Sequence, residues 1–176
     1  MRTTGEAVVV EQFDEWADEV WQACAAGFAM VAVRDSCVLR TLYPASNRNF
    51  IRVKVTAKGR LLGWAVIADV QKQNHPQYGD LRVGTILDGL SRAQDATAVI
   101  AAATRVLLDR NVDLITSNQS HGAWTRGLEE CGFFKGPSNF IFAASKGLSE
   151  MIQPFQQTVP RIHLNRGDGD NLLQYL

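Results

Sequence analysis

The sequence has no long apolar run and no surplus of charge of either sign. Its longest apolar stretch, residues 23–33, is broken by Gly27 and is much shorter than the roughly 20 residues that cross a bilayer, so we expect no membrane partner. Eighteen basic residues balance eighteen acidic ones. This balance provides no electrostatic footprint for a phosphate backbone, so we expect no nucleic-acid partner either.

Cysteine is scarce as well. Cys24, Cys37 and Cys131 are widely spaced and odd in number, which argues against a disulfide framework and against a clustered zinc site. We expect them to be small core residues, and we expect no metal. Near the start, only residues 7–10 form a consecutive apolar run before acidic residues follow, so no secretory segment is predicted and the cytoplasm is the expected location.

Signatures of several enzyme classes are also missing, because the chain has no Ser-His-Asp order, no P-loop and no His-Glu-x-x-His motif. What is present is the composition of a soluble globular protein, 46% hydrophobic and 20% charged over 176 residues. This length predicts a single domain, residues 1–176, with a core over about 10–146 and a C-terminal extension over 147–176.

Hydrophobic periodicity predicts alternating helices and strands. Apolar residues recur at three- and four-residue steps over residues 13–24, which is typical of an amphipathic helix, whereas residues 50–57 alternate as in a half-buried strand. The remaining pattern predicts helices over 34–43, 95–110 and 122–131, strands over 61–70, 81–87, 112–116, 133–134 and 140–143, and a tail with a helix and a short strand over 161–164.

These elements predict an α/β (α+β) fold on a mixed sheet with flanking helices. Strands 50–57 and 61–70 are joined by a short turn and form an antiparallel hairpin. The passage from strand 81–87 through a helix to strand 112–116 requires a right-handed crossover, which makes this central pair parallel. We expect strand 81–87 to end at the Asp88-Gly89 pair, which is typical of a turn.

The order of elements resembles the GNAT superfamily of acyl-CoA N-acyltransferases. Residues 59–67 are similar to the third strand of that family, and residues 118–133 are similar to its closing helix and Gly-Phe ending. The segments 13–16, 33–35 and 166–170 resemble a branch of GNAT-like proteins found in bacterial polysaccharide-associated contexts. The resemblance covers most of the chain and implies binding of acetyl-CoA or another acyl-CoA.

The resemblance also implies which residues contact the acyl-CoA. In the family, a strand that separates from its neighbour presents free backbone N–H groups to the acyl carbonyl, and the next loop and helix start hold the pyrophosphate. Carried onto this sequence, the contacts fall on Thr85, Ile86, Leu87, Arg92, Asp95, Ala96, Thr97 and Asn118. The family's pyrophosphate-loop glycines are absent here, and the Asp95 carboxylate is expected close to the phosphates.

Two residues are candidates for proton transfer. Leu128 stands where many family members carry a tyrosine that protonates the leaving thiolate, so His121 is the nearest substitute acid. Its alternative role is that of a capping or surface histidine at a helix start. Asp88, at the C-terminal end of its strand, is the candidate base, with an ordinary Asp-Gly turn as the alternative.

Other conspicuous residues favour structural roles. Trp64 and Trp124 sit on apolar faces and are expected in the core rather than in the walls of a sugar-binding cleft. Asp168 and Asp170 lie in a segment that lacks the length and the distal glutamate of a calcium loop, so we expect a solvated turn.

Two functions follow from the sequence. The first is an acyl-CoA-dependent N-acyltransferase that acts on a small-molecule amine. The alternative is a non-catalytic GNAT-like binding or structural module linked to bacterial polysaccharide metabolism, which the missing glycines and tyrosine favour. Pairing of sheet edges, which GNAT-like proteins often show, predicts a homodimer.

Overall fold

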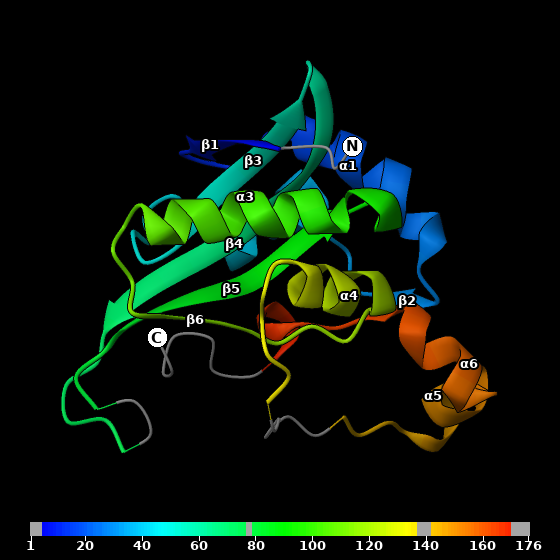
Figure 1. Ribbon diagram of the computed structural model, residues 1–176. Coiled ribbons are helices and arrows are strands. Elements are labelled where there is room, and N and C mark those ends of the chain that lie inside the picture. The colour runs from blue at the N-terminus through cyan, green and yellow to red at the C-terminus, as the bar shows by residue number, and fades with distance from the viewer. Residues whose placement is uncertain (1–4, 77–78, 137–141, 170–176) are drawn as a thin grey trace.

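A five-stranded mixed sheet forms the centre of the protein (Figure 1). The computed structural model describes residues 5–76, 79–136 and 142–169. Across the sheet the strands follow the order β1 (Glu6–Val10), β3 (Ile51–Ala57), β4 (Arg60–Gln71), β5 (Arg82–Ser91) and β6 (Leu114–Ser117). Neighbouring strands are antiparallel except β5 and β6, which are parallel. The predicted hairpin, parallel pair and mixed α/β sheet are therefore confirmed.

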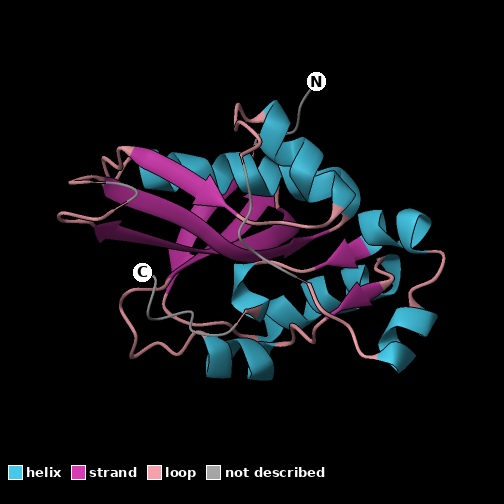
Figure 2. Ribbon diagram, turned by 90° about the horizontal axis from the view of Figure 1, so that it is seen from below, coloured by secondary structure: helices cyan, strands magenta, loops and turns pink. Residues whose placement is uncertain are grey.

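Helices cover both faces of this sheet (Figures 1 and 2). They are α1 (Glu15–Cys24), α2 (Ser36–Leu42), α3 (Ala96–Leu108) and α4 (Gly122–Glu130). The short helices α5 (Lys146–Met151) and α6 (Phe155–Thr158) lie to the side of the sheet (Figure 1). On one face of the sheet, α1 and α2 pack with Trp64 of β4 and Leu87 of β5. On the other face, α3 and α4 pack with Ile86 of β5, and Trp124 of α4 lies in this core. Both tryptophans are fully buried, which confirms their expected core role. Among the described residues no helix combines the length and apolar character that a membrane crossing requires.

The tail contributes a strand to the interior. Strand β7 (Ile162–His163) pairs in parallel with β2 (Met30–Val31), which lies between α1 and α2 (Figure 2). This confirms the short strand predicted near residues 161–164. Both residues of β7 are buried. Residues 162–168 therefore complete the centre of the fold and are not peripheral to it.

Strand β5 runs further than its sequence pattern predicts. It continues through Asp88 and Gly89, so the predicted turn at this pair is wrong. Opposite β4, Val66 pairs with Asp88 whereas Ile67 pairs with Ile86, so Leu87 is the extra residue of a β-bulge. The Asp88 carboxylate accepts the Gly89 N–H at 2.7 Å inside the protein, and this bond keeps a turn-forming pair within a strand.

Three other expectations need correction. Residues 6–10 form the edge strand β1, which pairs antiparallel to β3, although a run of three valines gave no alternation to signal it. Residues 133–134 are described and are not a strand. Of the predicted strand 140–143, residues 140–141 lie outside the described residues, and residues 142–143 are not a strand. Cys24 is buried and Cys131 is partly buried, but Cys37 is exposed on α2 rather than in the core.

Close backbone packing makes Gly63 of β4 a test of this arrangement. A Cβ at Gly63 would lie 2.2 Å from the Leu90 carbonyl oxygen and 2.8 Å from the Ser91 Cβ. We expect Gly63→Ala to lower the free energy of unfolding by about 2 kcal/mol, because the strands must shift apart. Denaturant unfolding measures this. Gly27→Ala, where a Cβ meets no atom within 4 Å, should change it little, and equal stability of both variants would contradict the packing.

Candidate functional site

Half of strand β5 is not paired with β6. The parallel ladder runs from Val83 opposite Leu114 to Ile86 opposite Ser117 and ends there. Residues 87–91 of β5 have no β6 partner in the described chain, because β6 gives way to the connection that leads into α4. The two parallel strands thus separate beyond Ile86. We call residues 87–91 the open half of β5.

A segment of the chain fills the space beside the open half. In residues 162–169, the His163 ring places Nε2 at 2.8 Å from the Gly89 carbonyl oxygen, and the Asn165 amide donates to Asp88 at 2.6 Å. On its other side, the Leu164 carbonyl accepts the Ser120 N–H at 2.9 Å, just after β6. The gap between the strands is therefore occupied by the protein itself.

Asp88 lies at the centre of this contact and is fully buried. Its Oδ2 accepts from the Arg34 Nε at 2.8 Å and from the Tyr43 hydroxyl at 2.7 Å. Its Oδ1 accepts from the Asn165 amide at 2.6 Å and from the Gly89 N–H at 2.7 Å. Four donors leave this carboxylate little capacity to accept a proton from a substrate. The geometry argues against the predicted role of Asp88 as a base and favours a structural one.

Arg34 joins a second carboxylate to this network. Its guanidinium is 2% exposed and also forms an ion pair with Asp168. Burial lowers the pKa of Arg34, but the two carboxylates raise it by more, so the net pKa lies above the ordinary value. Asp168 is thus an ion-pair partner and not part of a solvated turn, whereas Asp170 lies outside the described residues. The neighbouring Gly167 is required here, since a Cβ would lie 2.2 Å from the Tyr43 hydroxyl oxygen.

His121 caps helix α4. Its Nδ1 accepts the Ala123 N–H at 3.2 Å, which confirms the capping alternative. Burial lowers the pKa of His121 to about 4, assisted by the charges of His163, Arg126 and Arg161. The ring is therefore neutral at pH 7. Its predicted role as an acid stays a prediction, and the bond to α4 leaves only Nε2 for it.

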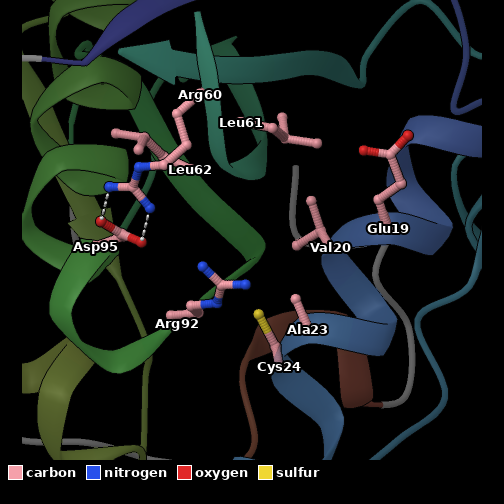
Figure 3. Close-up of a pocket in the computed structure, with 9 residues that line it drawn as sticks. All are labelled: Glu19, Val20, Ala23, Cys24, Arg60, Leu61, Leu62, Arg92 and Asp95. Carbon is pink, nitrogen blue, oxygen red and sulfur yellow. Dashed lines mark hydrogen bonds and ion pairs between the residues drawn. The ribbon is translucent and has the colours of Figure 1, made fainter. Parts of the chain in front are cut away.

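A pocket of about 260 Å³ opens just beyond the C-terminal end of β5, next to the open half (Figure 3). It lies between α1, the start of β4 and the connection from β5 to α3, and it is lined by Glu19, Val20, Ala23, Cys24, Arg60, Leu61, Leu62, Arg92 and Asp95. Figure 3 shows the Arg92 guanidinium directed into the space between α1 and Arg60. Arg92 is exposed, and no hydrogen bond or ion pair holds it among the described residues. It is available to an anionic ligand.

Asp95 is already neutralised within the pocket wall. Arg60 donates to its two carboxylate oxygens at 2.9 and 2.8 Å, and the Asp95 side chain is only 5% exposed (Figure 3). For this reason Asp95 makes no side-chain cap to α3, contrary to the usual role of an aspartate at a helix start. The expected repulsion between Asp95 and a bound phosphate is therefore offset by Arg60, which sequence reasoning missed.

The remaining predicted contact residues fall into two groups. Ala96 and Thr97 lie with Arg92 and Asp95 at the start of α3, where Ala96 is buried and the Thr97 hydroxyl donates to Glu130 of α4 at 3.1 Å. Leu87 is the buried bulge residue at the open half.

Thr85 and Ile86 lie in the half of β5 that pairs with β6, and the Thr85 hydroxyl is 3.2 Å from that of Thr116. Asn118 directly follows β6. The predicted residues thus lie at the two ends of the open half. Of those predicted on β5, only Leu87 and Asp88 lie beyond the residues that pair with β6.

The network around Asp88 was not predicted. Arg34 is 54 positions from Asp88 and 134 from Asp168 in the chain, so no local pattern connects them. The one available signal was that segments 33–35 and 166–170 both resemble the same branch of GNAT-like proteins.

Solved structures of acetyltransferases share this fold. A ribosomal-protein-alanine N-acetyltransferase from Brucella melitensis biovar Abortus 2308 aligns with 80% of this chain and 99% of its own, at 14% identity and a TM-score of 0.54. The aminoglycoside acetyltransferase AAC(6')-Iy, bound to a CoA bisubstrate analog, aligns with 81% of this chain and 99% of its own, at 12% identity and a TM-score of 0.54. A Trypanosoma brucei acetyltransferase aligns with 80% of this chain and 99% of its own, at 14% identity and a TM-score of 0.52.

At these identities the likeness establishes the fold, which is that of the GNAT acetyltransferases. No protein-family model and no curated protein matches the chain.

The buried network predicts a large stability effect at Asp88. Asp88→Asn removes the charge that balances Arg34 and places an amide against N–H donors, so we expect the free energy of unfolding to fall by about 3 kcal/mol. Denaturant unfolding measures the change. Asp109→Asn, on an exposed residue after α3, serves as the control and should change stability little. A stable Asp88→Asn protein would show that the four hydrogen bonds are dispensable.

The buried histidines predict acid sensitivity. His121 and His163 both have a lowered pKa in the folded protein, so the unfolded chain binds more protons below about pH 6.5, and stability falls as the pH falls toward 4. For His121 alone we expect a loss of about 2 kcal/mol between pH 7 and pH 5. His121→Asn keeps a capping side chain and should show a shallower pH dependence in denaturant unfolding, whereas His75→Asn, in the β4–β5 loop, should match the wild type. Stability that rises toward pH 5 would refute this.

Proposed function

We propose that this protein is an acyl-CoA-dependent N-acyltransferase that acts on a small-molecule amine. The observation that carries the proposal is the unpartnered Arg92 guanidinium, which faces a pocket where β5 leads into α3 (Figure 3). In the proposed complex Arg92 binds the CoA pyrophosphate with charge-assisted hydrogen bonds. The first N–H groups of the helical turn that begins at Ala93 supply further donors.

The chain offers a substitute for the missing glycine loop. Arg60 neutralises Asp95, so the first turn before α3 presents a guanidinium without an opposing free carboxylate on the same turn. Ala93 and Gln94, next to Arg92, are exposed, so their backbone is accessible to a ligand. This combination supports pyrophosphate binding by the Arg92 side chain in a loop that lacks the family's glycines.

The reaction would take place beside the open half of β5. The amine nitrogen attacks the thioester carbonyl, a C–N bond forms, the C–S bond breaks and the proton of the amine passes to a base. The bulge at Leu87 supports this placement, since bulges re-aim a strand next to active sites. The first two structural neighbours are named for a ribosomal-protein alanine and for an aminoglycoside, and these two kinds of amine are the first acceptors to test.

The filled gap favours a second candidate, a GNAT-like module without transfer chemistry. His163 and Asn165 occupy backbone and side-chain groups of Gly89 and Asp88 that an acyl carbonyl would approach. In this candidate the fold retains a ligand pocket at Arg92 but not a working acyl site.

Thermal unfolding with acetyl-CoA, longer acyl-CoAs and free CoA tests binding. Ligand at about 100 times its dissociation constant should stabilise the protein by about 2.7 kcal/mol. We expect Arg92→Ala to raise the dissociation constant for acetyl-CoA roughly 10- to 100-fold, because a charge-assisted hydrogen bond is lost. Arg105→Ala removes the same charge from the last turn of α3 and should bind as the wild type does.

Release of the CoA thiol in the presence of the two kinds of amine then distinguishes the candidates. Binding with turnover supports the transferase, and binding without turnover supports the non-catalytic module. Absence of any stabilisation by acyl-CoA would refute the proposed transferase.

A further inference from the structure

The His163 ring carries an unused lone pair inside the protein. Its Nε2 is 2.8 Å from the Gly89 carbonyl oxygen, and because a carbonyl only accepts, Nε2 bears the proton. Nδ1 is then an acceptor, and it is buried without a hydrogen-bond partner among the described residues. The whole residue is 0% exposed. Leaving such an atom unsatisfied costs about 1–3 kcal/mol, which calls for a functional explanation.

The other titratable groups beside the open half are already committed. Asp88 accepts four hydrogen bonds, and the Tyr43 hydroxyl donates to it. His121 uses Nδ1 to cap α4. Asp168 is held by Arg34 and by the Asn165 N–H. Within the described part of the chain, His163 Nδ1 is thus the acceptor left for a substrate proton at this place.

We propose that His163 is the catalytic base of the acyl transfer, a role that rests on the proposed function. The amine nitrogen forms a bond with the thioester carbonyl carbon while its proton passes to Nδ1. The C–S bond then breaks with its electron pair on sulfur, and the imidazolium returns the proton to the CoA thiolate. The products are the amide and the free thiol, and His163 is neutral again.

Charges around His163 suit a base that becomes positive during the reaction. Asp88 on β5 and Asp168 on the turn Arg166–Asp168 favour the imidazolium, whereas Arg34 opposes it and His121 on α4 is neutral. Two carboxylates share one guanidinium, so one negative charge is uncompensated. Burial outweighs these charges and lowers the pKa of His163, which keeps the ring neutral and able to accept a proton at pH 7.

Phe28 packs against both histidines and is the partly exposed member of this group. Its ring centroid is 5.0 Å from that of His163 and 5.0 Å from that of His121, and Phe28 itself is partly exposed. On the opposite side Trp124 packs 5.6 Å from His163 and is fully buried. The strand pair β2–β7, which holds the Phe28 segment near His163, contains only two residue pairs. In the proposed reaction the amine approaches from the side of Phe28, and the Phe28 ring must move to admit it because His163 is 0% exposed.

The test compares His163→Gln with the wild type in the full chain, with acetyl-CoA and the amine that gives the highest turnover. We expect kcat/KM to fall at least about 100-fold, the range for loss of a general base, and the acidic limb of its pH profile to disappear. Stabilisation by acetyl-CoA should be unchanged, because the Arg92 pocket is intact. Imidazole should restore part of the rate, and His75→Gln should behave as the wild type does.

Each contrary result has a distinct meaning. Turnover by His163→Gln within about threefold of the wild type, or a lower rate with an unchanged pH profile, overturns the role of His163 and leaves the transferase intact. Absence of acetyl-CoA binding by the wild type refutes the transferase itself. If His163→Gln does not fold, ¹⁵N NMR of the wild-type ring decides: an unprotonated Nδ1 at pH 7 with acetyl-CoA bound supports the proposal, and a protonated Nδ1 overturns it.

Discussion

The centre of this protein depends on one buried carboxylate. Asp88 receives hydrogen bonds from the segment between β2 and α2, from the residue after α2, from its own strand and from the tail of the described chain. A charge at 0% exposure is tolerated because Arg34 compensates it and four donors replace water. The same bonds place His163 and Asn165 against the open half of β5, so the carboxylate also determines what a substrate would meet there.

The two ends of that open half have different electrostatic designs. At the Asp88 end, Arg34 pairs with two carboxylates, Asp88 and Asp168, and both Arg34 and Asp88 are buried. At the other end, Arg60 and Asp95 pair with each other and leave Arg92 exposed beside a pocket. The anionic group of an extended ligand would bind the exposed Arg92 guanidinium, and the rest of the ligand would face the buried groups around Asp88. The exposed Arg92 supports the acyl-CoA proposal, whereas the filled space at the Asp88 end favours the non-catalytic module.

Most of the fold could be predicted from the hydrophobic pattern, because helices α1, α3 and α4 each bury one face and the central strands β4 and β5 are buried almost continuously. The failures have local physical causes. Asp88-Gly89 has the sequence of a turn, but a bulge and a side-chain bond keep it in β5. The place of Arg92 just before α3 could be inferred, but the Arg60–Asp95 pair could not, since it depends on how the start of β4 lies beside the start of α3.

Arg34 and its partner Asp168 lie far apart in the sequence, and this separation has a consequence for biosynthesis. Arg34 leaves the ribosome 134 residues before Asp168 and must wait for it and for Asn165 before the interior can close. Until then the nascent sheet exposes the Asp88 carboxylate and the open half of β5, and another polypeptide could pair with that edge. The segment that closes this interior, residues 162–168, is therefore synthesised after every other partner of Asp88 and Arg34.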